Sequence, residues 1–132
     1  MSSETPKRLF FTIGGFSGTS YQVVWREGKL LYSWRPLRGE MASEAIRPEP
    51  EQWNAFWQEL SRIDVWAWQG DFSDMKVPAG TSWALEIEHA GQWVEVSGMN
   101  AYPPGGKGPD MPPLFRRFLR ALSTLMDGRN LI

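Results

Sequence analysis

The segment YQVVWREGKLLYSW, from Tyr21 to Trp34, decides the fold because it predicts a β-hairpin. Its turn, Glu27-Gly28, is a two-residue connection of the kind that joins paired antiparallel strands. Alternate residues then form one apolar, largely aromatic face, which consists of Tyr21, Val23, Trp25, Leu30, Tyr32 and Trp34. The opposite face is mixed, with Gln22, Val24, Arg26, Lys29, Leu31 and Ser33. One face of this hairpin is therefore expected to cover a core.

A related pattern occurs later in the chain. GTSYQVVWREGKLLYSW begins at Gly18, and GTSWALEIEHAGQWVEV begins 62 residues later, at Gly80. The second pattern predicts another hairpin, with a less well specified turn near His89-Ala90-Gly91. Its apolar face would consist of Trp83, Leu85, Ile87, Val94 and Val96.

An amphipathic helix is predicted after each hairpin. The first begins near Pro50, and its apolar face consists of Trp53, Phe56, Trp57, Leu60 and Ile63. The second is expected from about Pro112 to Met126, with Asp110 as its N-cap and Gly128 as its terminator. It would bury Leu114, Phe115, Phe118, Leu119, Leu122 and Leu125.

These elements predict an α+β fold. The apolar stretches Leu9–Ile13 and Val65–Trp68 precede the hairpins, and each is expected to add one strand. The result is an antiparallel sheet of about five or six strands, with two helices packed on one face. The order βββα-βββα would make residues 9–63 and 65–126 pseudo-repeat halves of a single domain, 1–132, through either duplication or convergence.

Composition excludes several classes of function. The chain has 132 residues and no cysteine, so disulfides, thiolate metal sites and cysteine nucleophiles are excluded. Fourteen basic and 15 acidic residues give a net charge of −1, which argues against nucleic-acid and membrane binding. No apolar run approaches the ~20 residues that span a bilayer. Leu9–Ile13 is too short for the core of a signal peptide, so a cytoplasmic location is expected.

The sequence predicts no catalytic centre, cofactor or metal site. His89 is the only histidine and lies in a predicted turn, without a nucleophile-elbow motif elsewhere. Asp71 and Asp74 lack the further ligands of a calcium loop. Lys107 lies among glycines, but the neighbouring prolines remove amide donors that a phosphate site would need. A solvated basic face is predicted for Arg116, Arg117 and Arg120.

One predicted surface combines charge with an exposed aromatic residue. On the face turned away from the helices, Trp93 would be surrounded by Glu86, Glu88 and Glu95. Unpaired glutamates repel each other, and an exposed Trp forgoes about 2 kcal/mol of burial. Three interpretations remain: paired carboxylates that act on a sugar, a patch that binds a cationic partner, and, favoured slightly, neutralisation by Arg26 and Lys29.

The segment SGMNAYPPGGKGPDMPP, from Ser97 to Pro113, predicts a long, stiff connection between the last strand and the second helix. Gly98 permits a turn or bulge, and Asn100 can bond to the nearby backbone. Tyr102, held before two prolines, would cover apolar surface. The favoured interpretation is a structural strap, and the alternative is a ligand-facing edge formed by Asn100 and Tyr102.

Function is not specified by any motif in the chain. The best-supported hypothesis is a small, non-enzymatic interaction domain that meets a protein partner or a second copy of itself. Its contact residues would come from the Trp93–glutamate face or from the loop that carries Asn100 and Tyr102. The alternative is a domain that binds or hydrolyses a carbohydrate-like molecule through Trp93, Glu86, Glu88 and Glu95.

Overall fold

The hairpin around Glu27-Gly28 forms in the predicted register. The computed structural model describes residues 4–15, 18–73, 80–103, 106–107 and 111–131. In it, strands β2 (Ser20–Arg26) and β3 (Lys29–Arg35) pair Tyr21 with Trp34, Val23 with Tyr32, and Trp25 with Leu30. Glu27 and Gly28 have φ values of 54° and 80°, and positive φ at both positions is what the tight hairpin turn requires.

The second hairpin also forms, with its turn at Ala90-Gly91. Strands β6 (Thr81–His89) and β7 (Gln92–Met99) pair Leu85 with Val96 and Ile87 with Val94. These four side chains are buried, which confirms that their common face points to the core.

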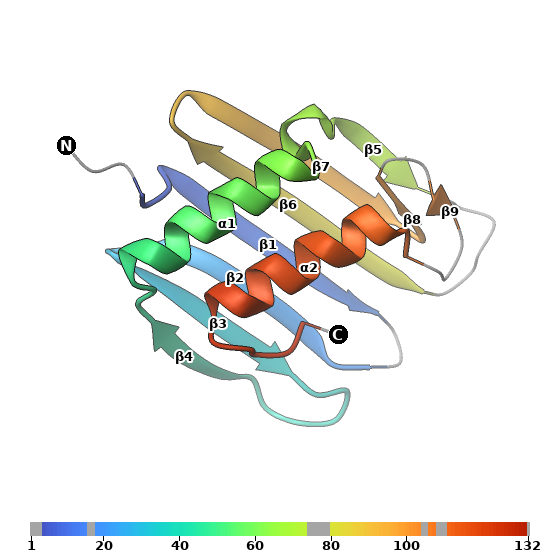
Figure 1. Ribbon diagram of the computed structural model, residues 1–132. Coiled ribbons are helices and arrows are strands. Elements are labelled where there is room, and N and C mark those ends of the chain that lie inside the picture. The colour runs from blue at the N-terminus through green and yellow to red at the C-terminus, as the bar shows by residue number, and fades with distance from the viewer. Residues whose placement is uncertain (1–3, 16–17, 74–79, 104–105, 108–110, 132) are drawn as a thin grey trace.

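The two hairpins belong to one seven-stranded sheet with the order β4-β3-β2-β1-β6-β7-β5. Strand β1 (Arg8–Gly15) is central and pairs antiparallel with both β2 and β6. The edges are β4 (Ala42–Ile46), antiparallel to β3, and β5 (Gly70–Ser73), parallel to β7. Six strands are thus antiparallel, as predicted, and a parallel edge strand is added. A separate short ladder joins β8 (Ala101–Tyr102) to β9 (Gly106–Lys107) (Figure 1).

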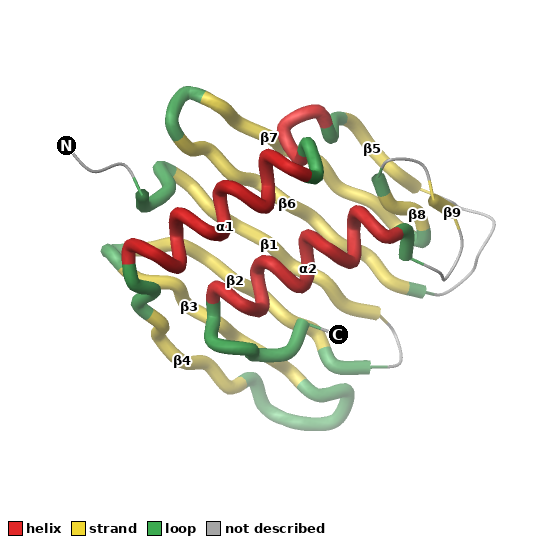
Figure 2. The backbone as a smooth tube through the Cα atoms, viewed as in Figure 1, coloured by secondary structure: helices red, strands yellow, loops and turns green. Residues whose placement is uncertain are grey.

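Both helices lie side by side across one face of the sheet (Figure 2). They are α1 (Pro50–Arg62), which begins at the predicted Pro50, and α2 (Pro113–Leu125), which lies within about a residue of its predicted bounds. Their apolar faces and the inner residues of the strands form a single core. Beyond α2, Gly128 N–H donates to the Ser123 carbonyl and Asp127 N–H to that of Thr124, which is a Schellman end. Its left-handed C′ residue is Asp127, with φ 56°, and the predicted terminator Gly128 follows it, also with positive φ.

Three details of the sequence-based prediction change. The prediction of a strand over Val65–Trp68 is wrong, because Val65–Ala67 forms the 3₁₀ helix η1. The chain turns sharply there, after α1, and buries Val65 and Trp68. The N-cap of α2 is Pro112, and Asp110 lies outside the described residues. The βββα-βββα repeat is not confirmed, since β4 is additional and β5 lies beside the far strand of its hairpin.

Candidate functional site

The face of the sheet opposite the helices is open in the described structure. Residues of β1, β2, β3, β6 and β7 alternate between the buried core and this open face. Two cross-strand rows of side chains dominate it. The apolar–acidic row consists of Leu31, Val24, Phe10, Glu86 and Glu95. The charged row consists of Lys29, Arg26, Arg8, Glu88 and Trp93, where Arg26 is placed beside Arg8 by extending the β1–β2 register two residues beyond Phe10 and Val24.

The predicted acidic cluster is present on this face. Glu95 lies directly opposite Glu86, and Trp93 lies opposite Glu88. Two like charges in such a pair destabilise a sheet unless a cation compensates them. The structure therefore places Glu86, Glu88, Glu95 and Trp93 together, as their alternation predicts.

The cation beside the cluster is Arg8, and the expectation that Arg26 and Lys29 neutralise it is wrong. Arg8 binds Glu86, and its Nε lies 3.2 Å from Glu88 Oε1. Lys7 Nζ lies 3.5 Å from Glu88 Oε2. The reason is topological, because β1 lies between the two hairpins and brings its own basic residues next to β6.

Trp93 is the most exposed of the eight tryptophans, with 58% of its surface accessible. Trp53, Trp57, Trp68 and Trp83 are buried, and the remaining three are half-buried. Most of the aromatic residues thus fill the core. A shallow hollow of about 250 Å³ lies beside Trp93's strand, and its lining includes Phe10, Ala84, Glu86, Glu95 and Ser97.

Asn100 and Tyr102 lie in the interior. Tyr102 is only 1% exposed, and its ring stacks on Trp83 at a centroid distance of 6.3 Å and contacts Phe115 at 4.8 Å. Burial raises the pKa of the Tyr102 hydroxyl. Asn100 is 4% exposed, and its Oδ1 accepts from Thr81 N–H at 3.1 Å. These contacts tie the segment after β7 to β6 and α2, as a strap would, and neither side chain reaches the open face.

His89 ends β6 and does not lie in a free turn. Its ring stacks on Trp57 with 3.8 Å between centroids and 6° between planes. Trp57 in turn stacks on Trp53, so His89 extends an aromatic cluster built by α1. His89, the only histidine in the sequence, therefore has a structural role in this cluster.

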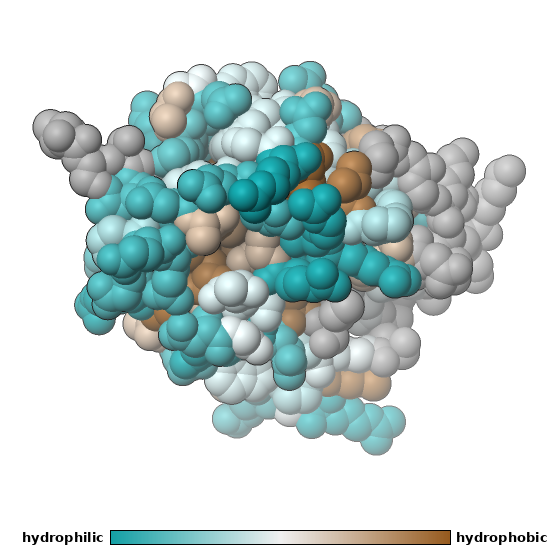
Figure 3. All heavy atoms as spheres, in the orientation of Figure 1, coloured by the Kyte–Doolittle hydropathy of each residue, from teal (hydrophilic) through white to brown (hydrophobic). Residues whose placement is uncertain are grey.

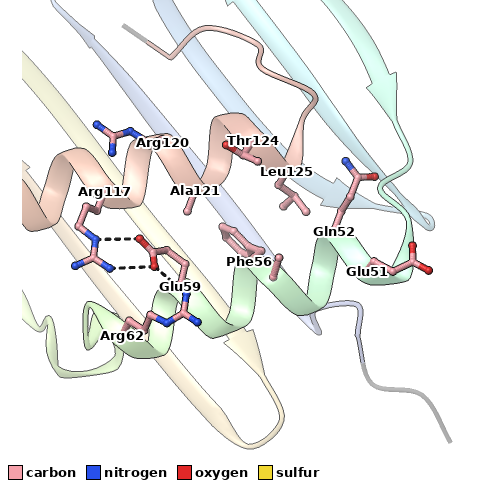
Figure 4. Close-up of a pocket in the computed structure, with 11 residues that line it drawn as sticks. Glu51, Gln52, Phe56, Glu59, Arg62, Arg117, Arg120, Ala121, Thr124 and Leu125 are labelled. Carbon is pink, nitrogen blue, oxygen red and sulfur yellow. Dashed lines mark hydrogen bonds and ion pairs between the residues drawn. The ribbon is translucent and has the colours of Figure 1, made fainter.

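A second hollow, of about 460 Å³, lies between the two helices. Figure 3 shows that hydrophilic residues cover most of this side of the molecule, with apolar surface visible between them. The floor of the groove includes Ala55, Phe56, Ala121 and Leu125. In Figure 4, Arg117 and Arg62 converge on Glu59 at one end, and Arg120 points away. The sequence did not predict this groove, because the small residues that form it lie on different helices.

An ion pair across the groove joins the two helices. Arg117 Nε and Nη2 donate to the Glu59 carboxylate at 2.9 and 3.0 Å, and Arg62 lies 3.6 Å away. The hydrogen bonds from Arg117, followed by its charge and that of Arg62, hold the pKa of Glu59 below its ordinary value. The pair is partly exposed, so its contribution to stability is modest.

We expect Glu59→Gln to remove a pH-dependent part of the stability. Because the pKa of Glu59 is lowered on folding, its contribution is complete above about pH 4.5 and is lost as the pH falls through the lowered pKa. Urea unfolding should show a loss of up to about 1 kcal/mol at pH 7 and none at the acid end. Glu40→Gln, an exposed change of equal charge, should cost nothing at either pH. An equal effect of the two variants at pH 7 would contradict the role of the ion pair.

No model of a known protein family matches the chain, and no curated protein sequence is significantly similar to it. Among the described residues, no three His, Asp or Glu side chains are grouped so that they could hold a metal ion. The helices of the described ranges are too short and too polar to cross a membrane. Any function of the open face or of the helix groove is therefore inferred from its geometry alone.

Proposed function

We propose that the protein is a small, non-enzymatic interaction domain of the cytoplasm, and that it binds a protein partner through the open face of its sheet. The observation that supports this most is Trp93, which is 58% exposed at the end of the charged row, opposite Glu88. Trp and Arg residues supply most of the binding energy in many protein interfaces. Asn100 and Tyr102 are not part of the proposed surface, because both are buried.

Apolar surface on the same face supports the proposal. An antiparallel sheet can leave one face in water, but that face is then usually polar. Here Phe10, Val24 and Leu31 lie directly opposite one another on three neighbouring strands, and each is only half-buried. A partner that covered them would remove apolar area from water at roughly 25 cal/mol for each Å². Charged residues on either side would orient that partner.

The alternative, binding or hydrolysis of a carbohydrate-like molecule, would use the same glutamates and Trp93. Its strongest support is the hollow between Glu86 and Glu95. That hollow measures about 250 Å³, which is below the ~300–1,000 Å³ typical of small-molecule sites. Glu86 is also held by Arg8. A flat, charged face fits a protein better than a sugar, so we favour the interaction domain.

We expect Trp93→Ala to abolish partner binding while leaving the fold intact. The side chain is mostly in water, so its loss should change the free energy of unfolding by less than about 1 kcal/mol. Its burial by a partner should shield it from acrylamide quenching. The quenching difference between wild type and Trp93→Phe therefore reports the exposure of Trp93 itself. The measurement is made with and without each candidate partner, including a second copy at high concentration.

Leu37→Ala is the matched control, because Leu37 is 61% exposed but lies in the loop between β3 and β4. It should bind every partner that the wild type binds. The proposal fails if Trp93→Ala and Leu37→Ala retain the same partners with equal affinity. A raised unfolding temperature with an oligosaccharide, lost in Trp93→Ala, would favour the carbohydrate alternative instead.

A further inference from the structure

The two halves of the open face carry opposite charge. On one side of β1, strands β2 and β3 present Arg26, Lys29 and Arg35. On the other side, β6 and β7 present Glu88 and Glu95, together with Trp93. In the described part of the chain, Arg26 and Lys29 take part in none of the ion pairs that hold the monomer together. Arg35 is not in any of these pairs either, so all three cations are available to an outside group.

We propose that the partner of the open face is a second copy of this chain, bound face to face about a two-fold axis that runs along β1. The inference rests on the proposed function, because it uses the same surface. Strand β1 is the middle strand of the seven, so the positive and negative halves lie symmetrically about it. A two-fold interface places the same patch of both subunits in contact and therefore requires such self-complementarity.

The direction of the axis follows from the charges. An axis parallel to the strands reverses the strand order between the two copies, so that β6 lies over β2 of the second copy and β7 over its β3. The acidic half then covers the basic half. An axis perpendicular to the strands would place β6 over β6 and bring the glutamates together, which is unfavourable for like charges at short range. Only the first arrangement is complementary.

Residue pairs follow from the register. Rotation about β1 maps each cross-strand row onto itself, so Glu88 faces Arg26 of the second copy and Trp93 faces its Lys29. A lysine over an indole ring is a favourable cation–π contact. The two Arg8 side chains approach each other at the axis, and each is already held by its own Glu86 and Glu88.

The area and the chemistry of the face fit a stable contact. With strands about 4.8 Å apart, seven strands span about 29 Å, and the longest strand is about 30 Å long. A standard interface buries about 800 Å² on each partner, which this face can supply. Packed sheets lie about 10 Å apart, so the half-buried Phe10 side chains of the two copies would meet at the axis, with the Glu88–Arg26 pairs to either side of it.

Sedimentation equilibrium over a wide range of concentrations tests the proposal, with Arg26→Glu as the decisive variant. We expect the wild type to dimerise, with an affinity that falls as salt is raised. Arg26→Glu should raise the Kd at least tenfold, because two glutamates then face each other at each of two equivalent positions. Arg120→Glu has the same charge change on the exposed side of α2 and should leave the Kd unchanged.

A second variant shows whether the affinity lost in Arg26→Glu is due to charge or to a failure to fold. Arg26→Glu combined with Glu88→Lys restores opposite charges across the two-fold axis. Extending the register of β1 and β2 places residue 26 beside Arg8, so the new glutamate can replace Glu88 as a partner of Arg8 within the monomer. We therefore expect the double variant to regain most of the lost affinity.

Two results would overturn the dimer. One is a wild type that remains monomeric at the highest concentration, and the other is an Arg26→Glu variant that dimerises like Arg120→Glu. Suppose that the chain is monomeric, that another protein shields Trp93, and that Trp93→Ala no longer binds this protein. The proposal of an interaction domain then stands, and the proposal that its partner is a second copy is wrong. If neither association depends on Trp93, both proposals fail.

Discussion

We expect Gly98→Ala to lower the free energy of unfolding by about 3 to 4 kcal/mol, although it adds a single methyl group. A Cβ at this position would lie 2.3 Å from the Phe72 carbonyl oxygen, 2.6 Å from Trp83 Nε1 and 2.7 Å from the Ala101 carbonyl oxygen. Two of these three atoms belong to the backbone, so they cannot move aside as a flexible side chain does. Overpacking of this kind costs ~1–3 kcal/mol before any hydrogen bond is lost.

The same glycine makes room for a buried hydrogen bond. Trp83 Nε1 donates to the Ala101 carbonyl at 2.9 Å, and the indole crosses Gly98, its partner on β7. A methyl group there would push the indole away and leave a buried donor unsatisfied, at a cost of about 1–3 kcal/mol. The segment that follows β7 would then lose one of its attachments to the sheet.

Urea unfolding followed by tryptophan fluorescence measures this effect. Gly18→Ala is the matched control, because nothing lies within 4 Å of a Cβ at Gly18. It should leave the unfolding midpoint within the range of ordinary surface changes, about 0.5 kcal/mol. A Gly98→Ala loss below about 1 kcal/mol would mean that β5 and the indole adjust freely.

Local patterns in the sequence predicted the hairpins and helices because their evidence lies within a few residues. The turn Glu27-Gly28 fixes which residues face each other, and the spacing of Trp53, Phe56 and Leu60 fixes the buried side of α1. A short apolar run carries less information. Val65–Trp68 suits a strand as well as a buried turn, and only the packing after α1 selects the turn.

The order of strands in the sheet is a long-range property, and the errors at the site come from it. The alternation in β6 and β7 was enough to place Glu88 and Trp93 on the outer face. It could not show that β1 lies between the hairpins, and so Arg8 was missed as the partner of Glu88. The burial of Tyr102 depends in the same way on where α2 places Phe115.

The Phe118→Ala variant of α2 should lose about 3–5 kcal/mol of stability. Phe118 is fully buried where the sheet, the 3₁₀ segment and α2 meet. Its ring meets Phe11 of β1 edge-on at 5.2 Å and Trp68 at 5.9 Å. Because the helix and strand backbones cannot close completely over the missing ring, a cavity remains and adds to the lost transfer free energy.

Two further substitutions in α2 serve as comparisons for Phe118→Ala. Phe118→Leu keeps most of the volume and should cost about 1.5 kcal/mol. Thr124→Ala, on the exposed side of the same helix, should cost less than about 0.5 kcal/mol. Domains of this size are stable by only about 5–15 kcal/mol, so Phe118→Ala removes a large part of the total. Equal losses for Phe118→Ala and Phe118→Leu would place the ring outside the tightly packed centre and contradict the arrangement of α2 on β1.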